Sequence, residues 1–346
     1  MSELSNITFK EVCDRLEAAQ NVLILTHMRP DGDTLGSAFA LRTLLRSLGK
    51  RAEVINSDDT IPKRLKFIFG VDSLRPETLP NDFTPEYIVS VDVSTSKLLD
   101  LIEPEYGDKV DLAIDHHELG SPFAKETYVG DVGACGEIIV DIFREFKSRG
   151  HDVLDRSAAT ALWAAICTDT GSFKFEAVTA ETHMRIAELH RAGINHSEIA
   201  RRLYDSRPIS QIRATRAALN ALHFYNNSRV AVINFTQAMM KENDVSREDI
   251  EDIISLTRGI EGVEIGMSIK QSPDHPTLYK VSMRSNRVAD VAKLCAVFGG
   301  GGHKRAAGCT LNADNEKLAE AALIEVIERE LCELDAAGAF EGADAL

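Results

Sequence analysis

The sequence predicts an α/β protein of two domains, in which a parallel sheet with helices on both faces precedes a smaller α/β domain. Three observations lead to this fold class. Short apolar runs alternate with helical patterns through the first half of the chain, which is typical of parallel strands joined by helical crossovers. The 346 residues are long for one domain. A fresh set of strand and helix patterns then begins near residue 226.

The first domain is predicted to span residues 1–193 and to contain four strands. Each predicted strand is a short apolar run, and the four lie at residues 22–25, 52–56, 87–91 and 110–114. Helical periodicity covers residues 9–19, 35–48, 135–146 and 155–165, and then a helix pair over 179–207 that is divided at Gly193. Gly49 suits the left-handed cap that ends the second of these helices.

A helical linker over residues 194–225 is expected to lead into a second domain over residues 226–346. Strands are predicted there at 230–235, 263–269 and 278–284. Helices are predicted at 247–257, 288–297 and 318–334, and the second of these runs into a glycine cluster at 299–302.

Charge and cysteine usage exclude several classes of protein. Lys and Arg number 39 against 54 Asp and Glu, and the net charge of −15 has the wrong sign for a protein that tracks along a long nucleic acid. The six cysteines lack the spacing of a disulfide framework or a structural zinc site. No basic leader with an apolar core and no run of roughly 18 apolar residues is present. We therefore expect a cytoplasmic protein without membrane contact, and a homodimer is compatible with the sequence.

Aspartates and histidines stand where the predicted strands end. The set comprises His27, Asp31, Asp33, Asp92, Asp115, His116, His117 and, in a polar stretch after the helix at 155–165, Asp169. The carboxyl ends of parallel strands share one edge of a sheet, where open α/β sheets bind their ligands. Taken alone, Asp33 could cap the following helix and Asp31 could close a turn. Their joint placement favours a metal site.

The residue types in this set indicate which metals and which chemistry to expect. Carboxylate oxygens mixed with imidazole suit Mn²⁺, Mg²⁺ or Fe²⁺, and even four of these aspartates with two of the histidines are too many ligands for one ion. Two divalent ions that share a carboxylate fit the number of ligands. Paired ions about 3.5–4 Å apart stabilise the attacking and leaving oxygens of a displacement at phosphorus. The sequence thus predicts a phosphoester or phosphoanhydride hydrolase.

Five motifs in this order resemble the DHH phosphoesterase superfamily, and within it the two-domain DHH/DHHA1 proteins of the bacterial nanoRNase A type. They are His27-x-x-x-Asp31-x-Asp33, Asp92, Asp115-His116-His117, Asp169-Thr170-Gly171 and the Gly299–His303 run. The resemblance covers nearly the whole chain. It implies that His27 and Asp31 bind one metal ion, that Asp33, His116 and Asp169 bind the other, and that Asp92 bridges the two. His117 then acts as general acid or phosphate contact, and Asp115 orients its neighbours.

The same resemblance implies a nucleotide-binding site in the second domain. Its members are Gly300, Gly301, Gly302 and His303 of the glycine run, together with Ser282, Arg284 and Ser285 at the end of a predicted strand. Glycines let a ligand approach the backbone N–H groups closely, and an Arg fork suits a terminal phosphate. An ordinary glycine loop and a salt-bridged strand end are the alternative interpretations.

The expected activity is Mn²⁺-dependent hydrolysis of short oligoribonucleotides to mononucleotides, with removal of the 3′ phosphate from 3′-phosphoadenosine 5′-phosphate as a further activity. Cleavage of cyclic di-AMP or its linear dinucleotide product is the alternative within the same enzyme class. An exonuclease for single-stranded DNA and a family II pyrophosphatase fit less well, because the chain lacks additional DNA-binding domains and carries the glycine-rich His303 motif. A nucleotide sensor without catalysis is opposed by the intact set of metal ligands.

Overall fold

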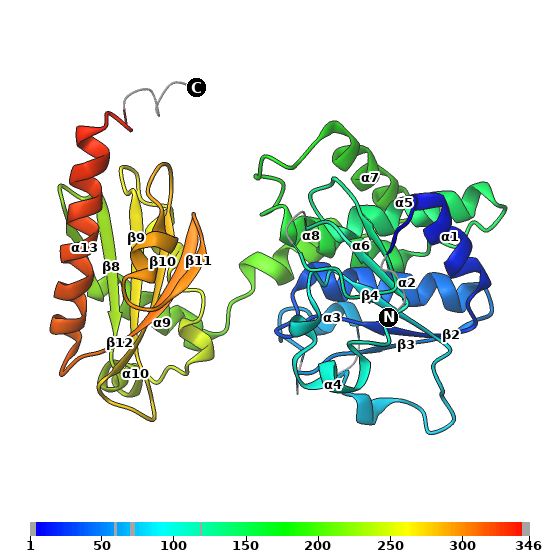
Figure 1. The fold of residues 1–346 in the computed structure, drawn as a ribbon, viewed down its shortest axis with the longest axis horizontal. Coiled ribbons are helices and arrows are strands. Elements are labelled where there is room, and N and C mark those ends of the chain that lie inside the picture. Colours follow the sequence, from blue (N-terminus) through cyan, green and yellow to red (C-terminus); the bar gives the residue numbers. More distant parts are fainter. Residues whose placement is uncertain (1–4, 59–60, 70–72, 118–119, 341–346) are drawn as a thin grey trace. The chain divides into compact units, whose positions relative to one another are not determined.

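The computed structural model describes residues 5–58, 61–69, 73–117 and 120–340. Its chain forms two compact units, Met1–Ser206 and Arg207–Leu346, which we call unit 1 and unit 2 (Figure 1). The predicted linker at 194–225 spans the boundary between them. Helices and strands occur in both units, which confirms the predicted α/β fold class.

Unit 1 is built on a six-stranded sheet in which every pair of neighbours is parallel. Its spatial order is β1-β6-β5-β4-β2-β3. The strands are β1 (Ser5–Asn6), β2 (Asn21–Leu25), β3 (Arg51–Ile55), β4 (Tyr87–Val91), β5 (Leu112–Asp115) and β6 (Glu126–Val129). The chain passes from β2 outward to β3 and then returns to β4 on the other side of β2, so the direction of winding reverses between β2 and β4.

Helices cover both faces of this sheet. The longer ones are α1 (Phe9–Ala18), α2 (Gly32–Ser47), α5 (Cys135–Ser148), α6 (Arg156–Asp169) and α7 (Ala180–Arg191). Short helical segments are α3 (Lys66–Phe69), η1 (Pro76–Thr78), η2 (Ser96–Ile102), α4 (Glu103–Tyr106), α8 (His196–Ala200) and the π-helical η3 (Arg201–Asp205). One core joins α1, α2, α5 and α6 to the strand side chains Val22, Ile24 and Val89, whereas the residues between them, such as Leu23 and Leu25, pack with η2 and α4. Alternate strand residues therefore pack on opposite faces, as expected of a doubly covered sheet.

Unit 2 contains a six-stranded mixed sheet with the order β11-β12-β10-β9-β8-β7, in which only the β8–β9 pair is parallel. Its strands are β7 (Leu222–Tyr225), β8 (Val230–Phe235), β9 (Ile265–Gln271), β10 (Leu278–Ser285), β11 (Gly301–His303) and β12 (Ala306–Asn312). Its helices are α9 (Ile209–Ala221), α10 (Gln237–Glu242), η4 (Glu248–Ile250), α11 (Ser255–Arg258), α12 (Val291–Ala296) and α13 (Glu316–Ala336). The odd-numbered residues of β10 join α12 and α13 in the core, and the even-numbered ones face the other side.

Several predicted elements differ from the structure. The helix expected at 247–257 is two short pieces, η4 and α11. The polar stretch expected after residue 165 is still helical, because α6 continues to Asp169. The apolar pattern also does not predict the strands β1, β6, β7, β11 and β12. Strand β12 begins Ala-Ala-Gly-Cys, and small residues give little of the β-branched pattern that marks a strand.

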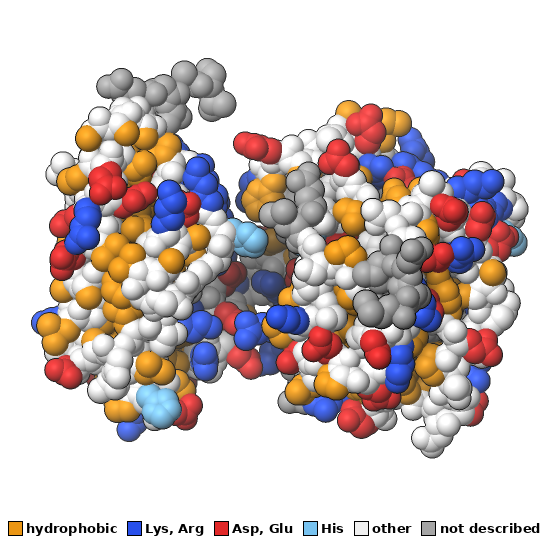
Figure 2. All heavy atoms as spheres, viewed as in Figure 1, with side chains coloured by type: hydrophobic (Ala, Val, Ile, Leu, Met, Phe, Trp, Pro, Cys, Tyr) orange, Lys and Arg blue, Asp and Glu red, His pale blue; other side chains and the backbone are white. Residues whose placement is uncertain are grey.

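The surface carries both signs of charge. Acidic and basic side chains are interspersed over the visible face of each unit (Figure 2). No helix among the described segments is long and apolar enough to cross a membrane.

Candidate active site

The strand ends of unit 1 bring the predicted metal ligands together. His27 and Asp31 follow β2, Asp92 follows β4, and the His116 and His117 pair follows β5. Because β5, β4 and β2 are adjacent in the sheet, their carboxyl ends meet at one edge, at the point where the winding reverses. The eighth residue of the set, Asp169, arrives instead from the last turn of α6. The expectation that Asp169 lies in a polar stretch beyond the end of this helix is therefore corrected.

Asp92 stands at the centre of the cluster, and its two carboxylate oxygens face different neighbours. Oδ2 lies 3.5 Å from His27 Nε2, and Oδ1 lies 3.5 Å from His116 Nε2. His27 Nε2 is also 3.7 Å from Asp31 Oδ1, while His116 Nε2 is 3.8 Å from Asp33 Oδ2 and 3.3 Å from Asp169 Oδ2. These contacts form two groups of potential metal ligands, His27 with Asp31 and Asp92, and Asp33 with His116 and Asp169. A third group joins Asp92 and Asp115 to His116 and His117.

The backbone at Asp92 is strained, which helps to explain how its side chain reaches both groups. Its φ is +58°, a left-handed conformation that is uncommon for residues other than glycine. The Asp92 N–H still donates to Ile114 O at 2.9 Å, so the sheet pairing holds the residue in this conformation. Strain of this kind is concentrated at functional sites.

His27 and His116 face Asp92 through Nε2, and each ring is oriented through Nδ1. His27 Nδ1 is 2.9 Å from Met28 O, and His116 Nδ1 is 3.2 Å from Val132 O. With Nδ1–H donating to a carbonyl, Nε2 is left as the metal-binding atom. His116 Nε2 and Asp92 Oδ1 are both buried and have no hydrogen-bond partner among the described residues. Unpaired buried acceptors of this kind, together with hard oxygen and imidazole donors, fit a divalent metal ion.

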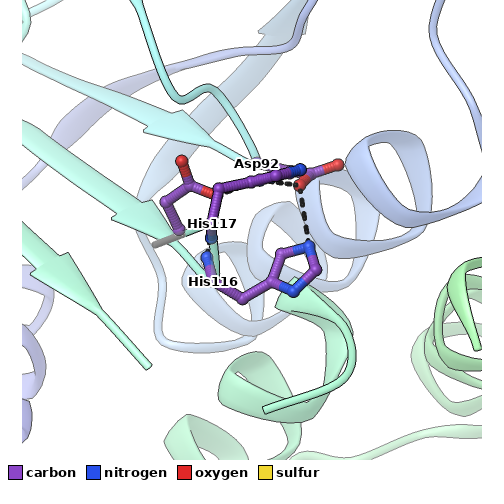
Figure 3. A group of neighbouring side chains, drawn as sticks. Asp92, His116 and His117 are labelled. Carbon is purple, nitrogen blue, oxygen red and sulfur yellow. Dashed lines mark hydrogen bonds and ion pairs between the residues drawn. The ribbon is translucent and has the colours of Figure 1, made fainter. Parts of the chain in front are cut away.

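His117 is placed differently from His116, as Figure 3 shows, although both rings point toward Asp92. Its Nδ1 lies 2.8 Å from Asp115 Oδ1, which also accepts the backbone N–H groups of His116 and His117. The side chain is 50% exposed, against 11% for His116. Asp115 thus fixes the turn after β5 and orients the His117 ring.

Charges in the cluster shift one another's protonation. Burial opposes a charge on His27, but Asp31 and Asp92 raise its pKa to about 11. Burial likewise opposes a charge on His116, and Asp92 and Asp33 outweigh it and raise the pKa to about 10. Burial and the charge of Asp92 raise the pKa of Asp33. In the absence of metal, these side chains therefore carry protons, and a cation would have to displace those protons in order to bind.

Unit 2 contains a shallow groove of about 560 Å³ on the open face of its sheet. Its lining includes Ser282 and Arg284 of β10, the Gly299–Gly302 run, and Gly308 and Thr310 of β12. Gly300 is required by space, because an added Cβ would lie 2.2 Å from Gly308 O. Gly302 has a φ of +144°, which side chains rarely adopt. Lys280 also lines the groove, so basic groups stand at two positions along β10.

Two predicted substrate contacts lie outside this groove lining. Ser285 is buried, and its hydroxyl donates to Ala289 O at 2.7 Å within unit 2. Its side chain lies on the core side of β10, whereas the side chain of Arg284 lies on the other side, so Ser285 stabilises the end of the strand from within the core. His303 is exposed at the end of β11, next to the groove in sequence but not among its lining residues.

Main-chain groups also hold Asp33, and they were not predicted from the sequence. The backbone N–H groups of Cys135 and Gly136, at the start of α5, donate to Asp33 Oδ2 at 2.6 Å and Oδ1 at 2.8 Å. The glycines at 133 and 136 on either side of this helix start were an available signal, because glycine allows a carboxylate to approach the backbone closely.

Comparison with known proteins gives a consistent result. Residues 21–166 match the N-terminal domain of the DHH family, and residues 227–329 match the DHHA1 domain. The chain is 28% identical over 335 residues to the bifunctional oligoribonuclease and PAP phosphatase NrnA of Thermus thermophilus, which covers 92% of this chain and 93% of the relative. The NrnA protein of Bacillus subtilis is 22% identical and covers 88% of this chain and 94% of the relative.

A solved structure resembles the whole chain. The crystal structure of an exopolyphosphatase-related protein from Bacteroides fragilis superimposes with a TM-score of 0.82 at 23% identity, over 95% of this chain and 96% of that one. At this level of identity the likeness establishes a shared fold.

Proposed function

We propose, from the premise that this chain belongs to the DHH/DHHA1 family of phosphoesterases, that it hydrolyses short oligoribonucleotides to mononucleotides and removes the 3′ phosphate of 3′-phosphoadenosine 5′-phosphate. The geometry of Asp92 carries this proposal, because one carboxylate faces two separate ligand groups. The names of the relatives from Thermus thermophilus and Bacillus subtilis support the substrate class.

The cluster in unit 1 would hold two divalent cations, and its hard donors suit Mn²⁺, Mg²⁺ or Fe²⁺, with Mn²⁺ preferred. His27 and Asp31 would hold one, Asp33, His116 and Asp169 the other, and Asp92 would contact both. When bound, paired cations activate water and neutralise charge on the phosphate.

Protein side chains supply the remaining steps. His117 is oriented through Nδ1 by Asp115, and its half-exposed ring leaves Nε2 free to donate a proton to the leaving oxygen. In unit 2, Arg284 and Ser282 would bind the terminal phosphate of the substrate, with the backbone of Gly301 and Gly302 and the nearby His303 assisting. Gly300 would leave room for the ligand, since its own N–H donates to Cys295 O at 2.9 Å. A net charge of −15 agrees with a short substrate, since a long one requires an extended basic track.

The experiment is a Mn²⁺-supplemented time course on 5′-labelled RNA of about two to five nucleotides. 3′-Phosphoadenosine 5′-phosphate, cyclic di-AMP and a long RNA are run in parallel. His116→Ala should abolish turnover, and His151→Ala, an exposed histidine of the same unit, should not. Loss of the short RNA with wild type supports the proposal. Survival of the short RNA while cyclic di-AMP is consumed would assign the alternative substrate, and efficient decay of long RNA would contradict the proposed substrate length.

A further inference from the structure

One loop in unit 1 contacts His116, a member of the ligand group that Asp33, His116 and Asp169 form. It covers residues 130–134 and joins β6 to α5. Its Val132 carbonyl accepts from His116 Nδ1 at 3.2 Å, and its Gly130 N–H donates to Asp115 O at 2.9 Å. The loop therefore sets the direction in which His116 presents Nε2.

The helix that follows this loop holds the opposite side of the ligand group. Both carboxylate oxygens of Asp33 accept N–H groups from the first two residues of α5, Cys135 and Gly136. Asp33 is fully buried, so no solvent replaces these bonds if the helix start moves. A displacement of the loop and the start of α5 would thus misplace His116 and Asp33 together.

Glu137 keeps this loop and helix start in place. Its side chain is fully buried, and Oε1 accepts the Gly133 N–H at 3.1 Å, which ties the first turn of α5 back to the loop. Its other oxygen, Oε2, accepts from Arg185 Nη1 of α7 at 2.8 Å. A buried carboxylate is costly unless it is paired and hydrogen-bonded, and Arg185 supplies that partner.

Arg185 is itself held rigidly. It makes a two-pronged contact with Asp141, one turn further along α5, at 2.6–3.1 Å, and its side chain is only 12% exposed. The neighbouring Arg144 contacts Asp141 and Glu188 on the same pair of helices, but neither of its bonds reaches the loop. Arg185 therefore supports both the loop, through Glu137, and the contact between α5 and α7. Arg144 supports only the contact between α5 and α7.

We propose that Glu137 and Arg185 are positioning residues for the metal centre: they act through the loop at 130–134 and the start of α5 to hold His116 and Asp33 in metal-binding geometry. This inference rests on the proposed function, in which those two residues bind a divalent cation. Residues that orient metal ligands from behind typically change metal affinity by about 10- to 100-fold when replaced.

The test is a titration of the full chain with Mn²⁺, followed by the electron paramagnetic resonance signal of free Mn²⁺. Glu137→Gln and Arg185→Gln should each weaken the tighter binding by about 10-fold or more, and Arg144→Gln should leave it unchanged. Turnover should recover at high Mn²⁺ in the first two variants, since the ligands themselves remain. Amide hydrogen exchange at Cys135 and Gly136 should be faster in Glu137→Gln than in wild type or Arg144→Gln.

The outcomes separate this inference from the function on which it rests. Wild-type protein that binds no Mn²⁺ would contradict the proposed metal centre itself. Wild-type binding that Glu137→Gln and Arg185→Gln both preserve would overturn the positioning role and leave the metal centre intact. Equal weakening in Arg144→Gln would also overturn it, because the effect would then belong to the α5–α7 contact as a whole. Should Glu137→Gln not fold, Arg185→Gln carries the test against Arg144→Gln.

Discussion

The two units of this protein place their polar groups in opposite ways. In unit 1 the centre of the candidate site is made of buried charges, and Asp33 and Asp92 are at most 3% exposed. In unit 2 the groove is lined by five glycines among other small and apolar residues, with two basic side chains, and the Gly301–His303 strand is exposed. Buried charges need several fixed partners, whereas exposed backbone needs only the right conformation. The comparison predicts that unit 1 controls the rate of chemistry and unit 2 controls substrate affinity.

Among the substitutions that test this comparison, Asp92→Asn should have the largest effect. The amide keeps the size of the side chain but cannot serve two ligand groups as a charged bridge, so kcat should fall by about 10³-fold or more. Steady-state kinetics on a short RNA at saturating Mn²⁺ measure the effect. Asp108→Asn, at an exposed position of unit 1, is the matched control and should behave as wild type. If Asp92→Asn retained more than a tenth of the wild-type kcat, the central role of Asp92 in the site would be contradicted.

In unit 2 the corresponding change is Arg284→Ala. Loss of a charge-assisted contact of about 1.5–3 kcal/mol should raise KM by roughly 10- to 100-fold and change kcat by less than about 3-fold. Burial and the nearby Arg258 lower the pKa of Arg284, so an arriving phosphate would also relieve an unfavourable charge. The control is Lys293→Ala, an exposed residue of α12 outside the groove. A fall in kcat at unchanged KM would show that Arg284 acts in the chemical step, which would contradict the assignment of substrate affinity to unit 2.

The affinity of unit 1 for a divalent cation should depend on pH. The pKa values of about 11 for His27 and about 10 for His116 lie above the ordinary 6.5, so both rings carry a proton at neutral pH in the absence of metal. A cation must displace those protons, and its affinity should therefore rise with pH, by about 10-fold per unit for each proton released. Calorimetric titrations with Mn²⁺ at pH 6, 7 and 8, in buffers of different ionisation enthalpy, count the protons. An affinity that is independent of pH would show that the histidines are not ligands.

The smallest expected effect concerns Ser285, for which sequence and structure point to different roles. Its buried hydroxyl donates to Ala289 O, so Ser285→Ala should lower the free energy of unfolding by about 1 kcal/mol and leave KM within about 2-fold. Urea denaturation and steady-state kinetics on the same preparation measure the two quantities. Ser282→Ala, on the groove side of β10, is the matched variant and should raise KM instead. A tenfold rise in KM for Ser285→Ala would restore the substrate contact predicted from sequence.

The fold class and the order of the motifs can be predicted from the amino-acid pattern alone. Apolar runs ending in Asp92 or in Asp115-His116-His117 are local patterns, and a parallel sheet with alternating helices requires that such ends share one edge. The matches to the DHH N-terminal domain and the DHHA1 domain confirm that level of the prediction. Strand β4 was predicted with its observed bounds for the same reason.

Which atoms face one another depends on the order of the strands and on how the helices pack. The two-sided contact of Asp92 depends on β4 lying between β2 and β5, and the hold on Asp33 depends on a helix about 100 residues away in sequence. Asp169 enters from a helix end, and Ser285 turns to the core because of the register of β10. Sequence patterns report the period and the ends of elements, whereas hydrogen-bond partners between distant segments are fixed by sheet order and packing.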